Sequence, residues 1–174
     1  MEVKHNVFRN YLNNWFVETG SYAGDGVQSA LDAGFKNIIS FDVAEYNYNL
    51  CVNRFSGHGN NVMFVLADSA LDLWRYIDQI QEPITFWLDA HWSGEGSPSG
   101  LVKNPLLYEL NQIRRHAIKT HTILIDDVRC WRGETWARDF SLENVIDTLL
   151  AINPAYKIGY VDGSEPNDVL TATI

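Results

Sequence analysis

The chain has 174 residues, a formal net charge of −9, and 46% hydrophobic against 20% charged residues. These values are typical of one folded domain, here 1–174, that buries a core without disulfides or a structural metal. The acidic balance argues against the broad basic face of a nucleic-acid-binding protein, although it allows a local basic patch. No apolar stretch approaches the ~20 residues of a membrane span, and the first residues lack the apolar centre of a signal peptide. The sequence therefore predicts a cytoplasmic protein without nucleic-acid or membrane partners.

Strand and helix patterns alternate along most of the chain. Apolar runs typical of buried strands cover residues 16–20, 37–43, 62–68, 84–91 and 121–128. Helical stripes follow the first, third, fourth and fifth runs, and begin near Val27, Ser69, Pro105 and Ser141. Two extended runs over 156–163 and 168–174 then flank a turn-rich segment. This order predicts a three-layer α/β sandwich with a mostly parallel, seven-stranded Rossmann-like sheet and an antiparallel terminal hairpin.

Two segments lie outside this alternation. Before the first strand, Phe8, Leu12 and Trp15 keep a helical spacing within a short N-terminal extension over 1–15. This stripe is open to three interpretations: the remnant of a lid, a dimer contact or plain packing. Residues 92–103 are rich in glycine, serine and proline, which predicts a mobile loop over the binding edge of the sheet.

Each strand run ends in one or two carboxylates, and these are the main candidates for a functional site. They are Glu18, Asp42, Asp68, Asp89 and the adjacent pair Asp126 and Asp127. Ligands of open parallel sheets bind outside the carboxyl ends of the strands, so we expect these acids to line one crevice. A row of carboxylates suits a ligand with hydroxyls, amines and a positive charge, and it also suits a metal ion.

A glycine-rich turn from Glu18 to Gly26 joins the first strand to the first helix. Gly20 and Gly24 let the backbone approach a ligand closely, and the start of the helix presents free N–H groups. The spacing is G-x-x-x-G-x-G, which differs from the G-x-G-x-x-G of dinucleotide binders, and no Walker lysine follows. Taken alone, the turn fits either a ligand site or a simple structural turn between a strand and a helix.

In combination, these features resemble the class I S-adenosylmethionine (SAM)-dependent methyltransferases. The stretch E-x-G-x-x-x-G from Glu18 resembles the first motif of that family, and Asp42 stands where its members hold the ribose hydroxyls. Asp68 ends the third strand, where an acid or polar residue meets the adenine, although it also fits a plain helix N-cap. The resemblance implies SAM as the cofactor. The implied cofactor-binding residues are Glu18, Gly20, Ser21, Tyr22, Gly24, Asp42, Asp68 and Ser69.

A second group of acids, Asp89, Asp126 and Asp127, ends the fourth and fifth strands, with His91 close behind the first. Carboxylates at such close quarters repel one another unless a cation neutralises them, and oxygen ligands favour Mg²⁺. The group resembles that of the metal-dependent sugar O-methyltransferases of the macrocin type. This resemblance implies that the three aspartates bind Mg²⁺ and that the acceptor is a sugar or glycan. It also implies a catalytic pair of Asp89 and His91, with His91 at the position where the family usually has an aspartate base.

Several side chains near this group are candidates for the wall of an acceptor pocket. Arg129, Trp131 and Arg132 follow the aspartate pair, and Trp92 begins the glycine-rich loop. Arg129 fits equally well as an ion-pair partner of the acids, and Trp92 fits equally well as a packing residue.

The sequence is also compatible with other functions. A metal-independent methyltransferase would rely on His91 alone, and His91 also fits a metal ligand or a packing residue. A nucleotide-dependent oxidoreductase is disfavoured by the glycine spacing. A non-catalytic relic of the fold is disfavoured by the retained acids, because clustered carboxylates without a use destabilise a protein. The sequence identifies neither the acceptor sugar nor the oligomeric state.

Overall fold

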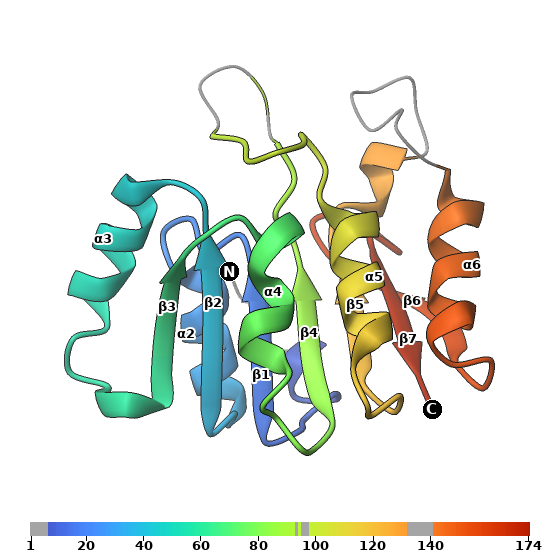
Figure 1. The fold of residues 1–174 in the computed structure, drawn as a ribbon, viewed down its shortest axis with the longest axis horizontal. Coiled ribbons are helices and arrows are strands. Elements are labelled where there is room, and N and C mark those ends of the chain that lie inside the picture. The colour runs from blue at the N-terminus through green and yellow to red at the C-terminus, as the bar shows by residue number, and fades with distance from the viewer. Residues whose placement is uncertain (1–6, 93, 95–97, 132–140) are drawn as a thin grey trace.

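The structure is a computed structural model that describes residues 7–92, 94, 98–131 and 141–174. The strands are β1 (Trp15–Thr19), β2 (Asn37–Asp42), β3 (Val62–Leu66), β4 (Ile84–Leu88), β5 (Thr122–Ile125), β6 (Lys157–Val161) and β7 (Val169–Thr173). They form a 7-stranded sheet in the order β3-β2-β1-β4-β5-β7-β6 (Figure 1). β1 to β5 run parallel, whereas β7 is antiparallel to both β5 and β6. The predicted sheet and its antiparallel terminal hairpin are confirmed.

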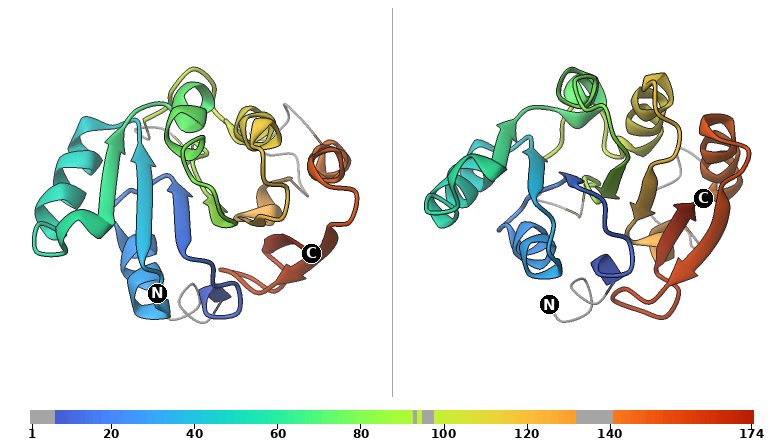
Figure 2. Two further views of the ribbon diagram at one scale, coloured as in Figure 1. Left: turned by 60° about the horizontal axis from the view of Figure 1, so that its bottom comes forward. Right: turned by 90° about the horizontal axis from the view of Figure 1, so that it is seen from below.

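Helices cover both faces of the sheet and complete the three predicted layers (Figures 1 and 2). They are α2 (Asp25–Ala33), α3 (Glu45–Arg54), α4 (Ser69–Ile77), α5 (Leu106–Arg115) and α6 (Leu142–Ile152), with short 3-10 helices η1 (Gly59–Asn61) and η2 (Val128–Trp131). α4, α5 and α6 pack on one face in a core that includes Leu73, Leu110 and Leu149. α2 packs on the opposite face, where Val27 is buried beside Phe16. Within the described part of the chain, no helix has the length and apolar character needed to cross a bilayer.

Side-chain caps begin the helices where the sequence predicts them. Asp68 accepts a hydrogen bond from the Ala70 N–H, and Ser141 forms a reciprocal capping box with Asn144. Each such cap contributes about 1 kcal/mol to stability. α5 begins one residue later than expected, at Leu106, but the Asn104 side chain still accepts from the Leu106 N–H at 3.2 Å.

The N-terminal stripe and α3 differ from the sequence-based expectation. Trp15 begins β1 rather than continuing a helix, and its indole N–H donates to Glu82 at 2.8 Å. Phe8 is fully buried, with its ring centroid 4.9 Å from those of Phe16 and Trp87, so this residue packs in the core. α3 was not predicted, because Cys51 is its one buried residue and the helix therefore has no apolar stripe.

Candidate functional site

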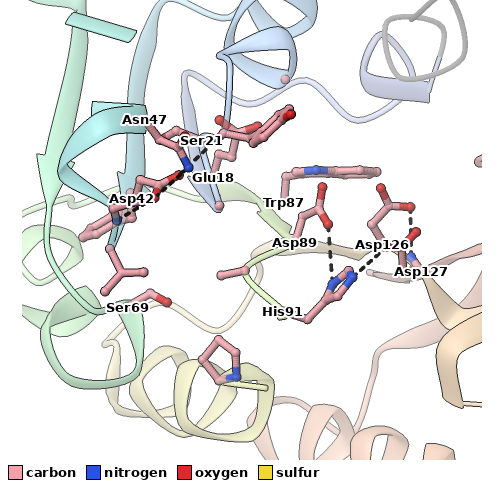
Figure 3. Close-up of a pocket in the computed structure, with 18 of the residues that line it drawn as sticks. Glu18, Ser21, Asp42, Asn47, Ser69, Trp87, Asp89, His91, Asp126 and Asp127 are labelled. Carbon is pink, nitrogen blue, oxygen red and sulfur yellow. Dashed lines mark hydrogen bonds and ion pairs between the residues drawn. The ribbon is translucent and has the colours of Figure 1, made fainter. Parts of the chain in front are cut away.

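The carboxyl ends of the parallel strands open into a cavity of about 1050 Å³ (Figure 3). Its wall comes from the glycine turn, the ends of β2 to β5 and the turn between β6 and β7. The predicted residues that line it are Glu18, Gly20, Ser21, Tyr22, Asp42, Asp68, Ser69, Asp89, His91, Asp126 and Asp127. A site for one drug-sized ligand measures roughly 300–1,000 Å³, so this cavity has room for two small molecules.

The glycine turn brings its backbone directly against the ends of two strands. Gly20 and Gly24 have φ of 88° and 83°, values that side chains rarely tolerate. A Cβ on Gly20 would lie 2.5 Å from the carbonyl oxygen of Asp89, so only glycine fits there. Gly24 does not line the cavity; it faces the ring of Phe55 and sets the start of α2. The turn is therefore shaped by both backbone conformation and contact.

Glu18 lies buried in β1 at the start of the turn, with 2% of its surface exposed. The Ser40 hydroxyl donates to its Oε2 at 2.5 Å, and the Ser21 hydroxyl lies 2.6 Å from that of Ser40. Gly26, in the first turn of α2, faces the same carboxylate so closely that a Cβ would overlap it. Sequence reasoning included Gly26 in the turn but missed this role, since the role depends on where the Glu18 side chain points.

Asp42 is held in a fixed orientation at the end of β2. Its Oδ2 accepts from the Tyr22 N–H at 2.9 Å and its Oδ1 from the Ala44 N–H at 2.8 Å. The Asn47 amide, from α3, approaches both oxygens at 3.2 and 3.3 Å. Asn47 also lines the cavity and was not predicted, because α3 itself was not predicted.

Asp68 has both of the roles between which the sequence left a choice open: it caps α4 and it lines the cavity. Its Oδ1 accepts from the Ala70 N–H at 2.9 Å, and its Oδ2 accepts from the Leu101 N–H at 2.5 Å. Gly100 packs against the same carboxylate, where a Cβ would overlap it. The described end of the glycine-rich loop therefore lies directly over Asp68.

A buried acid on α5, Glu109, supports the neighbouring Ser69 and was not predicted. The Ser69 hydroxyl donates to Glu109 Oε1 at 2.6 Å. Burial raises the pKa of Glu109 to about 7, against the lowering effect of this hydrogen bond. Gln112, one turn further along α5, donates to the carbonyl oxygens of Ser69 and Ala70 at 2.7 and 2.9 Å. The start of α4 is thus fixed by polar side chains inside the core.

His91 joins the acids of β4 to those of β5 (Figure 3). Its Nε2 lies 2.9 Å from Asp127 Oδ2, and its Nδ1 lies 3.6 Å from Asp89 Oδ1. Burial alone would lower the pKa of His91, but the hydrogen bond to Asp127 and the negative charges of Asp89, Asp127 and Asp126 outweigh it and raise the pKa. The imidazole is therefore oriented by its hydrogen bond to Asp127, with the Asp89 carboxylate near its other nitrogen; a base oriented by a carboxylate also occurs in catalytic sites.

The aspartate pair after β5 has a cationic partner. Arg129 Nη1 lies 2.5 Å from Asp127 Oδ1 and also pairs with the buried Asp168, so the ion-pair interpretation of Arg129 is confirmed. Asp168 precedes β7 and was not predicted, because the hairpin brings it here from the far end of the chain. Lys103 Nζ lies 4.1 Å from the ring centroid of Trp92, so this ring packs within its own loop. The Trp131 side chain and Arg132 lie outside the described residues.

Two groups of potential metal ligands occur among the described residues. In each group the ligand atoms lie within 4.8 Å of one another: Asp126, Asp127 and Asp168 in the first, and His91, Asp127 and Cys130 in the second. Asp89 belongs to neither group; it meets Asp127 through His91. The predicted trio of Asp89, Asp126 and Asp127 thus lines one cavity without forming one compact cluster.

Comparisons with known proteins bear on the fold alone. No family model and no curated protein sequence matches the chain. The SAH-bound methyltransferase PaMTH1 of Podospora anserina superposes with a TM-score of 0.66 at 13% identity, over 98% of this chain and 75% of that one. The SAH-bound Streptococcus mutans protein SMU.1697c, described as a methyltransferase, gives 0.62 at 14% identity, over 97% and 93%. The N-methyltransferase NodS of Bradyrhizobium japonicum gives 0.57 at 14% identity, over 91% and 83%. The protein therefore has the Rossmann-like fold of class I SAM-dependent methyltransferases.

Proposed function

We propose that this protein is a SAM-dependent O-methyltransferase that methylates a sugar hydroxyl with the help of a divalent cation. The observation that carries the proposal is the single cavity that joins two groups of acids. Glu18, Asp42 and Asp68 lie on its cofactor side, and Asp126 and Asp127 lie beside His91 on its other side. Methyl transfer requires a donor and an acceptor bound together, and the cavity volume suits two such ligands.

On the cofactor side, each acid matches one part of SAM. The buried Glu18 offsets the ammonium group beside the glycine turn. The two oxygens of Asp42 can accept the two ribose hydroxyls, since the Tyr22 and Ala44 N–H groups already hold this carboxylate in place. Asp68 and Ser69 then face the adenine. The acidic character of the wall also suits the positive sulfonium.

On the acceptor side, the donor set suits a hard cation such as Mg²⁺. Asp126, Asp127 and Asp168 bring carboxylate oxygens within 4.8 Å of one another, and Asp89 lies across His91. Hard oxygen ligands of this kind are the ones Mg²⁺ prefers, and it keeps several positions for water or substrate. A bound cation would lower the pKa of an acceptor hydroxyl. We expect Asp126 and Asp127 to hold it, and Asp89, which lies outside that group, would have to approach them to complete the predicted trio.

His91 is the proposed general base. Its ring is hydrogen-bonded to Asp127, lies near Asp89 and lines the cavity. In its neutral form it can take the hydroxyl proton as the oxygen attacks the methyl group, while the sulfur leaves on the opposite side. Only the neutral imidazole can accept this proton, so the rate should fall as pH is lowered through the pKa of His91. The neighbouring carboxylates raise that pKa, and a bound cation would offset part of their effect.

The lining also favours a neutral, hydroxyl-rich acceptor. Among the described lining residues there is no lysine or arginine, whereas carboxylates occur on every side. An anionic acceptor would meet repulsion throughout, and a sugar or glycan would find hydrogen-bond acceptors.

A metal-independent methyltransferase is the second candidate, and Arg129 is the observation that favours it. This guanidinium already pairs with Asp127 and Asp168, so part of the repulsion between the acids is relieved without a metal ion. Activity that persists in excess chelator would select this alternative over the cation-dependent one.

The proposal is tested first by calorimetric titration of S-adenosylhomocysteine into the purified protein. We expect micromolar binding that Asp42→Ala weakens by about tenfold or more, which corresponds to about 1.4 kcal/mol. Asp147→Ala, which removes an exposed acid on α6, is the matched control and should bind like the wild type. A folded wild-type protein that does not bind would contradict the proposal. Transfer of labelled methyl from SAM to sugar acceptors, with and without chelator, then tests the acceptor class and the cation.

A further inference from the structure

Three side chains with different donor atoms meet beside the cavity. His91 follows β4, Asp127 follows β5, and Cys130 lies in η2. An imidazole nitrogen, a carboxylate oxygen and the thiol sulfur of these residues lie within 4.8 Å of one another, and all three residues are partly buried.

The local backbone keeps this group together. Asp127 adopts a φ of 61°, and the Cys130 N–H donates to its carbonyl oxygen at 2.9 Å, which closes the tight turn of η2. The Val128 N–H donates to the carbonyl oxygen of Asp168 at 2.9 Å and ties the turn to the start of β7. Arg129 takes Oδ1 of Asp127, while Oδ2 faces His91 at 2.9 Å. The turn thus holds the thiol near one Asp127 carboxylate oxygen and one His91 ring nitrogen.

This donor set differs in chemistry from the carboxylates of the proposed Mg²⁺ site. Mg²⁺ favours oxygen ligands and binds thiolate and imidazole poorly. Zn²⁺ and Co²⁺ are borderline cations that bind cysteine sulfur, histidine nitrogen and carboxylate oxygen, commonly with three protein ligands and one open position. His91, Asp127 and Cys130 supply one ligand of each kind.

We propose that His91, Asp127 and Cys130 form a binding site for a borderline divalent cation of the zinc type. It shares Asp127 with the oxygen ligands of the proposed Mg²⁺ site but draws on a different set of partners. A cation bound there uses the lone pair of His91, so the imidazole can no longer accept a proton. Zinc-type cations should therefore inhibit methyl transfer; this consequence rests on the proposed function, whereas the binding itself does not.

Cobalt spectroscopy provides the test, because Co²⁺ bound to a thiolate shows a charge-transfer band in the near ultraviolet. The chain has 2 cysteines, so each can be assigned by substitution. We expect reduced wild-type protein titrated with Co²⁺ under anaerobic conditions to develop the band. Cys130→Ser should abolish it. Cys51→Ser is the matched control, since Cys51 is fully buried and donates to the Tyr22 carbonyl oxygen at 3.4 Å, and it should keep the band. Zn²⁺ should displace Co²⁺ and remove the band, whereas excess Mg²⁺ should not.

Two results would overturn the proposal: no band in folded wild-type protein, or a band that survives in Cys130→Ser. His91→Ala supplies a second reading, since loss of the nitrogen ligand should weaken Co²⁺ binding while leaving a thiolate signal at higher cobalt concentration. Circular dichroism checks that each variant is folded. Because no SAH is present in the titration, a protein that failed to bind SAH would still give a clear cobalt result.

Discussion

At the residue scale, the Glu18 carboxylate depends on the absence of a side chain at Gly26. The two face each other so closely that a Cβ on Gly26 would overlap Oε1 of Glu18. The Ser40 hydroxyl, which itself pairs with the Ser21 hydroxyl, holds Oε2 of the same carboxylate, so it has little room to move away. The position of this acid is therefore set by packing as much as by hydrogen bonds.

We predict that Gly26→Ala weakens SAH binding by about tenfold or more and destabilises the protein. Alanine in a helix would normally stabilise by about 0.5–1 kcal/mol relative to glycine, but here the overlap should cost about 1–3 kcal/mol. Titration calorimetry and urea unfolding measure the two effects. Gly57→Ala is the control, because a Cβ there meets nothing within 4 Å. If Gly26→Ala and Gly57→Ala had equal SAH affinities and equal free energies of unfolding, the Glu18 side chain would be able to move aside freely.

The sequence revealed the acids of the site but not the residues that hold them. Acids at strand ends form a pattern along the chain, so Asp42 and Asp127 could be predicted. Glu109 and Asn47 lie inside or at the start of helices with no such pattern, and their roles appear only when α5 and α3 pack against the sheet. The contact of Leu101 with Asp68 uses a backbone N–H, which every residue type except proline has, so no residue type signals it.

At the element scale, the described end of the loop before α5 closes one end of the cavity. Pro98, Ser99, Gly100 and Val102 line the wall, and the Leu101 N–H donates to Asp68 at 2.5 Å. At the other end of the loop, the Trp92 N–H donates to the carbonyl oxygen of Lys103 at 2.7 Å. If SAM binds as proposed, its adenine lies beneath this segment. The 6-amino group of the adenine and the Leu101 N–H then both donate to the Asp68 carboxylate.

We predict that Gly100→Ala pushes the segment away from Asp68, since its Cβ would overlap that carboxylate. SAH binding should weaken by about tenfold, or about 1.4 kcal/mol. The protein should also lose part of its preference for SAH over an analogue with a 6-oxo group in place of the 6-amino group, because Asp68 accepts a hydrogen bond from that amino group in the proposed complex. Competition calorimetry with both ligands measures the ratio. Gly57→Ala again serves as the control. If Gly100→Ala leaves the ratio of the two ligand affinities unchanged, the loop has no part in recognising the base.

Elements with apolar stripes could be predicted, and the one without a stripe could not. α4 and α6 were predicted from their stripes and their caps at Asp68 and Ser141. α3 buries Cys51 alone, and tertiary contact with β2 and β3 rather than periodicity keeps it in place. Trp15 continued a helical spacing in the sequence but became part of β1, because pairing with both β2 and β4 overrides a local pattern.

At the scale of the whole molecule, two buried groups give folding opposite responses to pH. Burial raises the pKa of Glu109 from 4.5 to about 7. Burial and the neighbouring His116 lower the pKa of His121 from 6.5 to about 3. The folded state therefore keeps a proton on Glu109 that the unfolded chain releases, so this contribution to stability falls as pH rises from about 4.5 to 7. The folded state keeps His121 neutral at pH values where the unfolded chain protonates it, so this second contribution to stability grows as pH rises from about 3 to 6.5.

We predict that Glu109→Gln removes the pH-dependent contribution of Glu109 to folding stability and leaves that of His121. Glutamine still accepts the Ser69 hydrogen bond but has no proton to lose. Between about pH 4.5 and 6.5, the free energy of unfolding of the variant should rise more steeply than that of the wild type, by at most about 1.4 kcal/mol per pH unit. Urea unfolding at several pH values gives both curves. Glu165→Gln, at an exposed acid, should follow the wild type, and parallel curves for Glu109→Gln would refute the assignment.

The place of β7 in the sheet affects how the protein is made. β7 lies between β5 and β6, and Ile125 pairs with Leu170 from the last strand in chain order. A ribosome releases β5 well before β7, so the growing chain carries an open apolar strand edge that nothing yet covers. The sheet closes only when β7 has left the exit tunnel and inserted between two strands synthesised earlier. A stop codon upstream of β7 would therefore yield a chain with that edge permanently open, a substrate for chaperones and proteases and a template for aggregation.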